Sequence, residues 1–246
     1  MIYGLEKSSL IDYPGKIACV VFLAGCNFRC RFCHNLELVL PELIKKQPKI
    51  SEEDFFNFLE TRRGLLDGVV VTGGEPTIYP DLSNFIKKIK NFGFLVKLDT
   101  NGTNPDILEK LINKKLIDYI AMDIKAPIGA KTQNSKLKAQ NYNIKIKNKY
   151  EKIIGVKTDL EEIKKSIEII KNSKVDHEFR TTVVPTLHTR QDIIDIAEYI
   201  SPSKYFLQNF RILTGKVIDK SLKEDLNFLS EIEKNLPKET NIKTRN

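Results

Sequence analysis

Short apolar runs alternate along the chain with segments whose apolar residues recur at helical spacing. The first run, residues 17–24, is apolar throughout, which is typical of a strand covered on both faces. Five later runs have the length and the β-branched or aromatic content of strands. The pattern therefore predicts strands at residues 17–24, 68–72, 94–99, 119–124, 177–184 and 204–210.

The segments between these runs combine capping residues with one apolar face, which is typical of amphipathic helices. Ser51, Pro105 and Thr189 stand where three of the helices should begin, and Thr158 with Glu161 forms a candidate capping box for another. A weaker helical pattern covers residues 222–236. The apolar positions that define these faces include Phe55, Leu59, Leu82, Phe85, Ile86, Ile89, Leu108, Leu111, Ile163, Ile167, Ile193 and Ile196.

Strands that alternate with helices indicate the α/β class, with parallel strands joined by helices. Six strand and helix units fall short of the eight in a full barrel, so we predict a partial (β/α)6 TIM-like barrel. We expect one domain over residues 1–246, with a core at about 15–215, a basic loop insertion at 126–157 and a helical tail at 216–246. In such folds the chemistry lies at the carboxyl ends of the strands.

The composition is that of a folded globular protein, with 41% hydrophobic and 29% charged residues. No apolar run approaches the roughly 20 residues that span a bilayer. The N-terminus, which carries Glu6, Lys7 and Asp12, lacks the apolar segment of a secretory signal. We therefore expect a cytoplasmic protein without a membrane partner.

Most of the net charge of +8 comes from residues 131–157, where eight lysines face the single acid Glu151. A solvated loop explains such a segment, and a docking patch is the alternative. The segment follows the fourth predicted strand, so it should emerge beside the strand ends. We hypothesise that Lys145, Lys147 and Lys149 steer an acidic protein partner to this edge. No nucleic-acid module is apparent, so no nucleic-acid partner is expected.

Three cysteines follow directly on the first predicted strand, in the order Cys26, Cys30 and Cys33. Thiolates bind both zinc and iron-sulfur clusters. Three ligands on a four-iron cluster would leave one iron open to substrate, whereas His34 could complete a Cys3His zinc site. The direct bond between Cys33 and His34 strains tetrahedral closure and weakens the zinc alternative. Cys19 lies within the apolar strand and is predicted to be a core residue.

Residues 25–35, GCNFRCRFCHN, are similar to the cysteine motif of the radical S-adenosylmethionine superfamily, in particular its glycyl-radical-enzyme activating branch. Residues 9–16, SLIDYPGK, resemble activators of anaerobic ribonucleoside-triphosphate reductase. The resemblance runs from residue 2 to about 216. It implies a [4Fe-4S] cluster whose open iron binds S-adenosylmethionine. Reductive cleavage would give a 5′-deoxyadenosyl radical, which would take a hydrogen atom from a glycine of a partner enzyme.

The resemblance also implies a set of cofactor contacts at the strand ends. The GGE motif would bind the amino group of S-adenosylmethionine, and Lys125 would neutralise its carboxylate. Asp99 and Asp123 would orient it, through a monovalent cation in some activating enzymes. Without the resemblance, Gly-Gly is an ordinary turn, an Asp-Lys pair a surface ion pair, and Phe32 a core aromatic. The implied contacts are Phe32, His34, Gly73, Gly74, Glu75, Asp99, Asp123, Ile124 and Lys125, with Cys26, Cys30 and Cys33 on the metal.

The expected activity is that of an oxidoreductase whose radical comes from the cofactor, so no catalytic acid or base is expected. Its partners would be a glycyl-radical enzyme and reduced flavodoxin or ferredoxin as electron donor. Residues 208–210, QNF, stand where some relatives place a histidine at the end of the last strand, which puts one contact in doubt. His177 and His188 are expected to be ordinary polar residues. Two alternatives are a radical enzyme acting on a small molecule or an RNA base, and a non-enzymatic zinc-binding adaptor.

Overall fold

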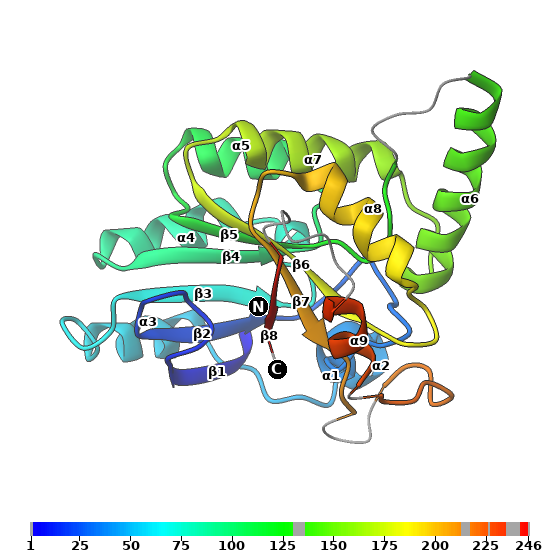
Figure 1. Cartoon of the computed structure of the whole chain (residues 1–246). Coiled ribbons are helices and arrows are strands. Elements are labelled where there is room, and N and C mark those ends of the chain that lie inside the picture. Colours follow the sequence, from blue (N-terminus) through cyan, green and yellow to red (C-terminus); the bar gives the residue numbers. More distant parts are fainter. Residues whose placement is uncertain (1, 130–135, 213–216, 226, 235–241, 246) are drawn as a thin grey trace.

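The strands form one eight-stranded sheet in which the spatial order follows the sequence (Figure 1). The computed structural model describes residues 2–129, 136–212, 217–225, 227–234 and 242–245. Only β1 is antiparallel to its neighbour, and the remaining pairs are parallel. The strands are β1 (Ile2–Ser9), β2 (Ala18–Leu23), β3 (Gly68–Gly73), β4 (Leu95–Thr100), β5 (Tyr119–Asp123), β6 (Asp176–Val183), β7 (Tyr205–Asn209) and β8 (Ile242–Arg245).

Helices connect the parallel strands and lie outside the sheet (Figure 1). Ser51 caps α3 by accepting from the Asp54 N–H, and Thr189 forms a capping box with Asp192 at α8. The capping box predicted at Thr158 is wrong, because Asp159 caps α7. The helices are α1 (Leu36–Val39), α2 (Pro41–Ile44), α3 (Glu52–Glu60), α4 (Leu82–Asn91), α5 (Pro105–Asn113), α6 (Lys136–Ile154), α7 (Leu160–Asn172), α8 (Arg190–Ile200) and α9 (Phe228–Lys234), with a 3-10 turn η1 (Pro76–Ile78).

The two faces of the sheet carry different residues because side chains alternate along each strand. Cys19 and Val21 of β2 face the large apolar core beneath the helices, which confirms the prediction for Cys19. Val20 points to the other face and joins Tyr13 and Tyr119 in a smaller cluster. This smaller cluster lies toward the amino ends of the strands. The carboxyl ends of the strands carry polar residues instead.

The six predicted strands correspond to β2 through β7, but the sequence did not reveal β1 and β8. Every residue of β1 after Ile2 is half-buried or exposed, and β8 has four described residues. Neither strand therefore forms a continuous apolar run. The loop predicted at 126–157 is wrong as well, since it contains the 19-residue helix α6. Its apolar face is sparse but deeply buried through Tyr150, Ile153 and Ile154. Lysines and asparagines obscure that face in the sequence.

The predicted terminal helix is shorter than expected, because the described residues place α9 at Phe228–Lys234. Residue 131, the first lysine of the basic segment, lies outside the described residues. Among the helices of the described part, none combines the length and apolar character that a membrane crossing requires.

Candidate active site

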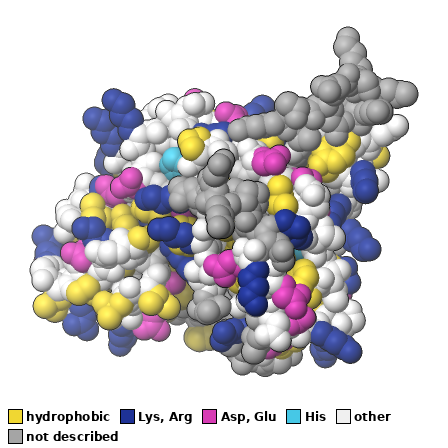
Figure 2. All heavy atoms as spheres, viewed as in Figure 1, with side chains coloured by type: hydrophobic (Ala, Val, Ile, Leu, Met, Phe, Trp, Pro, Cys, Tyr) yellow, Lys and Arg dark blue, Asp and Glu magenta, His cyan; other side chains and the backbone are white. Residues whose placement is uncertain are grey.

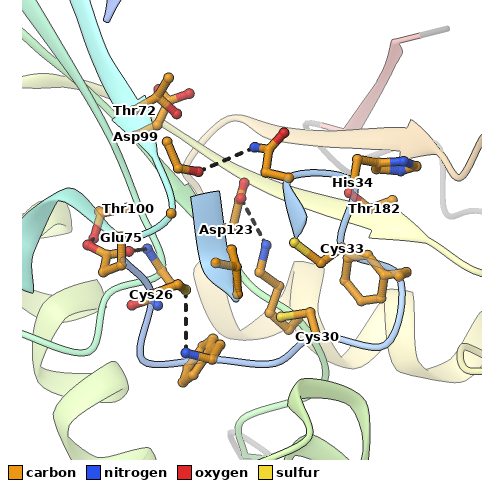
Figure 3. Close-up of a pocket in the computed structure, with 18 of the residues that line it drawn as sticks. Cys26, Cys30, Cys33, His34, Thr72, Glu75, Asp99, Thr100, Asp123 and Thr182 are labelled. Carbon is orange, nitrogen blue, oxygen red and sulfur yellow. Dashed lines mark hydrogen bonds and ion pairs between the residues drawn. The ribbon is translucent and has the colours of Figure 1, made fainter. Parts of the chain in front are cut away.

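A cavity of about 270 Å³ lies at the carboxyl ends of the parallel strands, where the sequence placed the chemistry (Figure 3). It brings together every predicted site residue except Ile124, whose side chain is fully buried in the core. Phe32 lines the cavity and is also buried, with 4% of its surface exposed, so its contact with a cofactor stays a prediction. The lining consists of Cys26, Phe28, Cys30, Phe32, Cys33, His34, Asn35, Val39, Thr72, Gly73, Gly74, Glu75, Asp99, Thr100, Asn101, Asp123, Lys125, Arg180, Thr182 and Gln208.

The cysteine loop is held in place by backbone hydrogen bonds to neighbouring elements. It leaves β2 at Gly25, whose φ of 100° lies in the region that favours glycine. The N–H groups of Arg29 and Arg31 donate to the carbonyls of Ile154 (2.8 Å) and Ile153 (3.1 Å). These carbonyls belong to the last turn of α6 and would otherwise lack helical partners. The basic helix therefore ends on the loop that carries the cysteines.

The three cysteines line one cavity, with Cys30 and Cys33 on the same wall in Figure 3. Burial raises the pKa of Cys26 to about 11 and that of Cys30 to about 12, so metal binding would release protons. Within the described residues, no group of three or more His, Cys, Asp or Glu side chains is arranged to hold a single metal ion. The His34 ring packs beside Phe210, with centroids 5.7 Å apart.

The glycine loop after β3 is packed directly against the cysteine loop. Gly74 donates its N–H to the carbonyl of Leu23 (2.9 Å), and Glu75 donates its N–H to that of Gly25 (2.8 Å). A Cβ atom on Gly74 would lie 1.9 Å from the Gly25 oxygen and 3.2 Å from Cys26 Cβ. Only glycine allows this approach, so the spacing of the two loops depends on it.

Glu75 is buried at the centre of the loops, with 2% of its surface exposed. One carboxylate oxygen accepts from the N–H and hydroxyl of Thr77 and from the hydroxyl of Thr100, at 3.1, 2.5 and 2.7 Å. The other accepts from the Asn101 N–H at 2.6 Å. Burial raises the pKa of Glu75, and these donors oppose that shift by favouring the ionised form. The side chain therefore ties the β3 loop to the β4 loop.

A network of five charged side chains forms the floor of the cavity. Arg180 joins the two aspartates, with Nη1 at 3.2 Å from Asp99 and Nε at 2.8 Å from Asp123. Lys125 Nζ lies 2.9 Å from Asp123, and Lys97 Nζ is in direct contact with Asp99. Burial opposes ionisation of Asp123, but Arg180 and Lys125 hold the pKa of its carboxyl well below the ordinary value.

Arg180, which lines the cavity, and Lys97, which lies behind Asp99, are residues of this network that the sequence reasoning missed. A signal was present, since Lys97 and Asp99 are two positions apart on one strand and must share a face.

His188, expected to be an ordinary polar residue, is buried, and burial lowers its pKa. Its Nδ1 accepts from the Val184 N–H, and its Nε2 lies 2.9 Å from the carbonyl of Lys125. It therefore supports the strand end that carries Lys125.

Comparison with known proteins agrees with this geometry. Residues 20–200 match the model of the radical SAM superfamily. A protein of Methanocaldococcus jannaschii, provisionally named a glycyl-radical enzyme activating enzyme, is 36% identical over 216 residues, which cover 85% of this chain and 80% of that protein. The pyruvate formate-lyase-activating enzyme of Clostridium pasteurianum is 33% identical over 134 residues, and about half of each chain is covered.

The fold is also found among solved structures. SuiB of Streptococcus suis, in a crystal structure with bound S-adenosylmethionine, matches 92% of this chain with a TM-score of 0.61 and 16% identity. This chain spans about half of SuiB, covering 51% of it, and a likeness at this identity concerns the fold alone. The superfamily implies a four-iron cluster and S-adenosylmethionine, and the cavity supplies three thiols beside a charged floor. The chain is an enzyme that belongs to the radical SAM superfamily.

Proposed function

We propose that this enzyme installs a glycyl radical on a partner enzyme. The observation that carries the proposal is the 36% identity with the Methanocaldococcus jannaschii protein, which extends over most of both chains. The matching cavity chemistry supports it, because the cysteines and the charged network lie around one space. Cys26, Cys30 and Cys33 would hold a [4Fe-4S] cluster, which would supply the electron for reductive cleavage of S-adenosylmethionine and so the radical chemistry that removes the glycine hydrogen.

The residues of the chain position the cofactor rather than transfer protons. Lys125 lies in the cavity with its Nζ 5.7 Å from the centre of the Phe32 ring, where it is placed to neutralise a carboxylate. We propose that Phe32 and His34 pack against the adenine. The Glu75 carboxylate already accepts four hydrogen bonds, so backbone carbonyls of the glycine loop are the better acceptors for the amino group.

The finer proposal, that the partner is an anaerobic ribonucleoside-triphosphate reductase, comes from the resemblance of residues 9–16. This segment turns between β1 and β2 at the amino end of β2, opposite the cavity. Its Ser9 hydroxyl accepts from the N–H groups of Ile11 and Asp12. Leu10 and Ile11 are 73% and 85% exposed. The segment therefore does not line the cofactor cavity. The identity of the partner enzyme is tested by offering candidate partners separately.

We expect the reconstituted enzyme, given S-adenosylmethionine and a reductant, to produce a glycine-centred radical in its partner. Electron paramagnetic resonance should be recorded with an anaerobic ribonucleotide reductase and with pyruvate formate-lyase offered separately. Deuteration of the partner glycine should place one deuterium in the 5′-deoxyadenosine formed. The matched control is each partner with its radical glycine changed to alanine. Cleavage of S-adenosylmethionine without a radical in either partner would contradict the proposal and favour a small molecule or RNA base as substrate.

We further propose that α6 receives the electron donor, a reduced flavodoxin or ferredoxin. Its last turn is bonded to the cysteine loop, and the exposed side chains of Lys145, Lys147 and Lys152 lie within about 14 Å of that turn along the helix. Figure 2 shows Lys and Arg side chains along the edge of the molecule where α6 lies. Lys149, expected to belong to this surface, instead pairs with Asp192 at the start of α8.

Replacing Lys145, Lys147 and Lys152 with glutamine should slow reduction by a flavodoxin about tenfold at low salt, because electrostatic steering would be lost. Stopped-flow reduction of the cluster at several ionic strengths measures this effect. The control replaces Lys7, Lys16 and Lys114, which are exposed and away from α6. If the rate of cluster reduction had the same salt dependence in the wild type and the α6 variant, the lysines of α6 would be solvent-exposed residues without a role in docking.

A further inference from the structure

We infer that Lys97 and Arg180 are built-in cations that take the place of the monovalent metal ion used by some activating enzymes. The inference rests on the proposed binding of S-adenosylmethionine in the cavity, but not on the identity of the partner. Lys97 lies within β4, two residues before Asp99, and only 2% of its side chain is exposed. It is a positioning residue, because it acts through Asp99, which lines the cavity.

Every carboxylate oxygen of the two aspartates already accepts a hydrogen bond from a cationic group. Asp99 Oδ1 accepts from Lys97, and its Oδ2 accepts from Arg180 at 3.2 Å. Asp123 Oδ1 accepts from Arg180 at 2.8 Å, and its Oδ2 from Lys125 at 2.9 Å. Sodium and potassium bind through oxygen atoms, so either ion would have to share an oxygen with a cationic group that already lies against it, and like charges repel at this distance. The residues present therefore do not fit a site for an added cation.

The charge balance also opposes an added cation. Three cationic side chains, Lys97, Lys125 and Arg180, surround two carboxylates. Two further acids lie nearby, and both already have their own partners: Glu75 accepts four hydrogen bonds from Thr77, Thr100 and Asn101, and Glu178 is bound by both terminal nitrogens of Arg245, at 2.7 and 2.8 Å. A further positive charge would meet repulsion in a desolvated space, where charges are poorly screened.

Lys97 has the properties of a fixed counter-ion. Its ammonium group cannot diffuse away, and the nearly complete burial of its stem holds it against Asp99. An alkali ion at this place would be lost at low salt, whereas the covalently attached lysine stays in contact with the Asp99 carboxylate at any salt concentration. The expected consequence is binding of S-adenosylmethionine that does not depend on sodium or potassium.

The test measures equilibrium binding of S-adenosylmethionine to the reconstituted, unreduced enzyme in sodium, potassium or tetramethylammonium chloride at one ionic strength. The wild-type dissociation constant should change less than about twofold among these salts, because tetramethylammonium is too large to coordinate a buried carboxylate. Lys97→Ala opens space beside Asp99, and this variant should bind about tenfold more tightly in sodium or potassium than in tetramethylammonium. Its thermal unfolding midpoint, which does not depend on the cofactor, should rise with the same ions.

The matched control is Lys90→Ala, which removes the lysine of another Lys–Asp pair, Lys90 and Asp118 at 2.7 Å, outside the cavity. It should show no preference among the three salts. Wild-type binding that requires sodium or potassium would overturn the inference, even if Lys97→Ala does not fold. A folded Lys97→Ala variant without ion preference in binding or unfolding would overturn the role of Lys97. Failure to activate any partner, with ion-independent binding intact, would count against the proposed function alone.

Discussion

Replacing Cys30 with alanine is expected to abolish cleavage of S-adenosylmethionine while leaving the chain folded. Cys30 lies between the other two cysteines in the loop and lines the cavity, so its loss removes one of three ligands to the cluster. Removing the buried sulfur should cost only about 1 to 2 kcal/mol of stability, because few atoms are lost. Bound iron and 5′-deoxyadenosine should be measured after anaerobic reconstitution, together with circular dichroism of the same sample.

Cys19→Ala is the matched control, because Cys19 is also buried but faces the apolar core beneath the helices. This variant should retain its iron and its cleavage activity at nearly the wild-type level. If Cys30→Ala still produced 5′-deoxyadenosine at the wild-type rate, Cys30 could not be a cluster ligand.

Gly74→Ala is expected to lower the cleavage rate by about 100-fold, the size of effect that a displacement of roughly 1 Å can produce at a reacting centre. The new methyl group would lie 1.9 Å from the backbone oxygen of Gly25, so one of the two loops must move. Gly25 directly precedes Cys26, and Gly74 precedes Glu75, whose N–H donates to the Gly25 carbonyl. The displacement would therefore reach both the cluster ligands and the β3 loop.

The rate should be measured as 5′-deoxyadenosine formed per bound cluster, which separates poor positioning from poor reconstitution. Gly129→Ala serves as the control, because a Cβ there would meet only Tyr199 at 3.5 Å and Lys164 at 3.8 Å, within ordinary contact distance. An unchanged rate in Gly74→Ala would show that the close approach of the two loops is not needed for cleavage.

The parallel strands could be predicted because several of them are buried apolar runs, as residues 17–24 illustrate, and the others are rich in β-branched or aromatic residues. Their carboxyl ends then fixed where the polar side chains would meet, so Cys26, Glu75 and Asp123 reached one cavity as expected. Strands β1 and β8 escaped notice because their residues form no continuous apolar run. Helix α6 escaped because four buried residues are enough to hold a helix whose other positions are mostly polar.

The sequence was least informative about which charged groups would pair. Lys97 and Arg180 lie inside predicted strands. A buried charge there is stable only when an oppositely charged side chain lies beside it, and for both residues this is Asp99. Such pairing depends on the order and register of the strands, which place Arg180 of β6 directly opposite Asp123 of β5. Likewise, the four donors to Glu75 come from its own loop after β3 and from the end of β4, which are distant in the sequence. The motif predicts a cofactor contact at Glu75, and the structure adds four hydrogen bonds to this side chain that the motif does not reveal.

The most direct measurement is anaerobic reconstitution of the wild-type chain with iron and sulfide, followed by addition of S-adenosylmethionine and a strong reductant. The chain should hold about four irons and convert S-adenosylmethionine into equal amounts of methionine and 5′-deoxyadenosine. A colourless protein that holds one zinc ion and forms no 5′-deoxyadenosine would contradict the assignment of the cavity to radical chemistry.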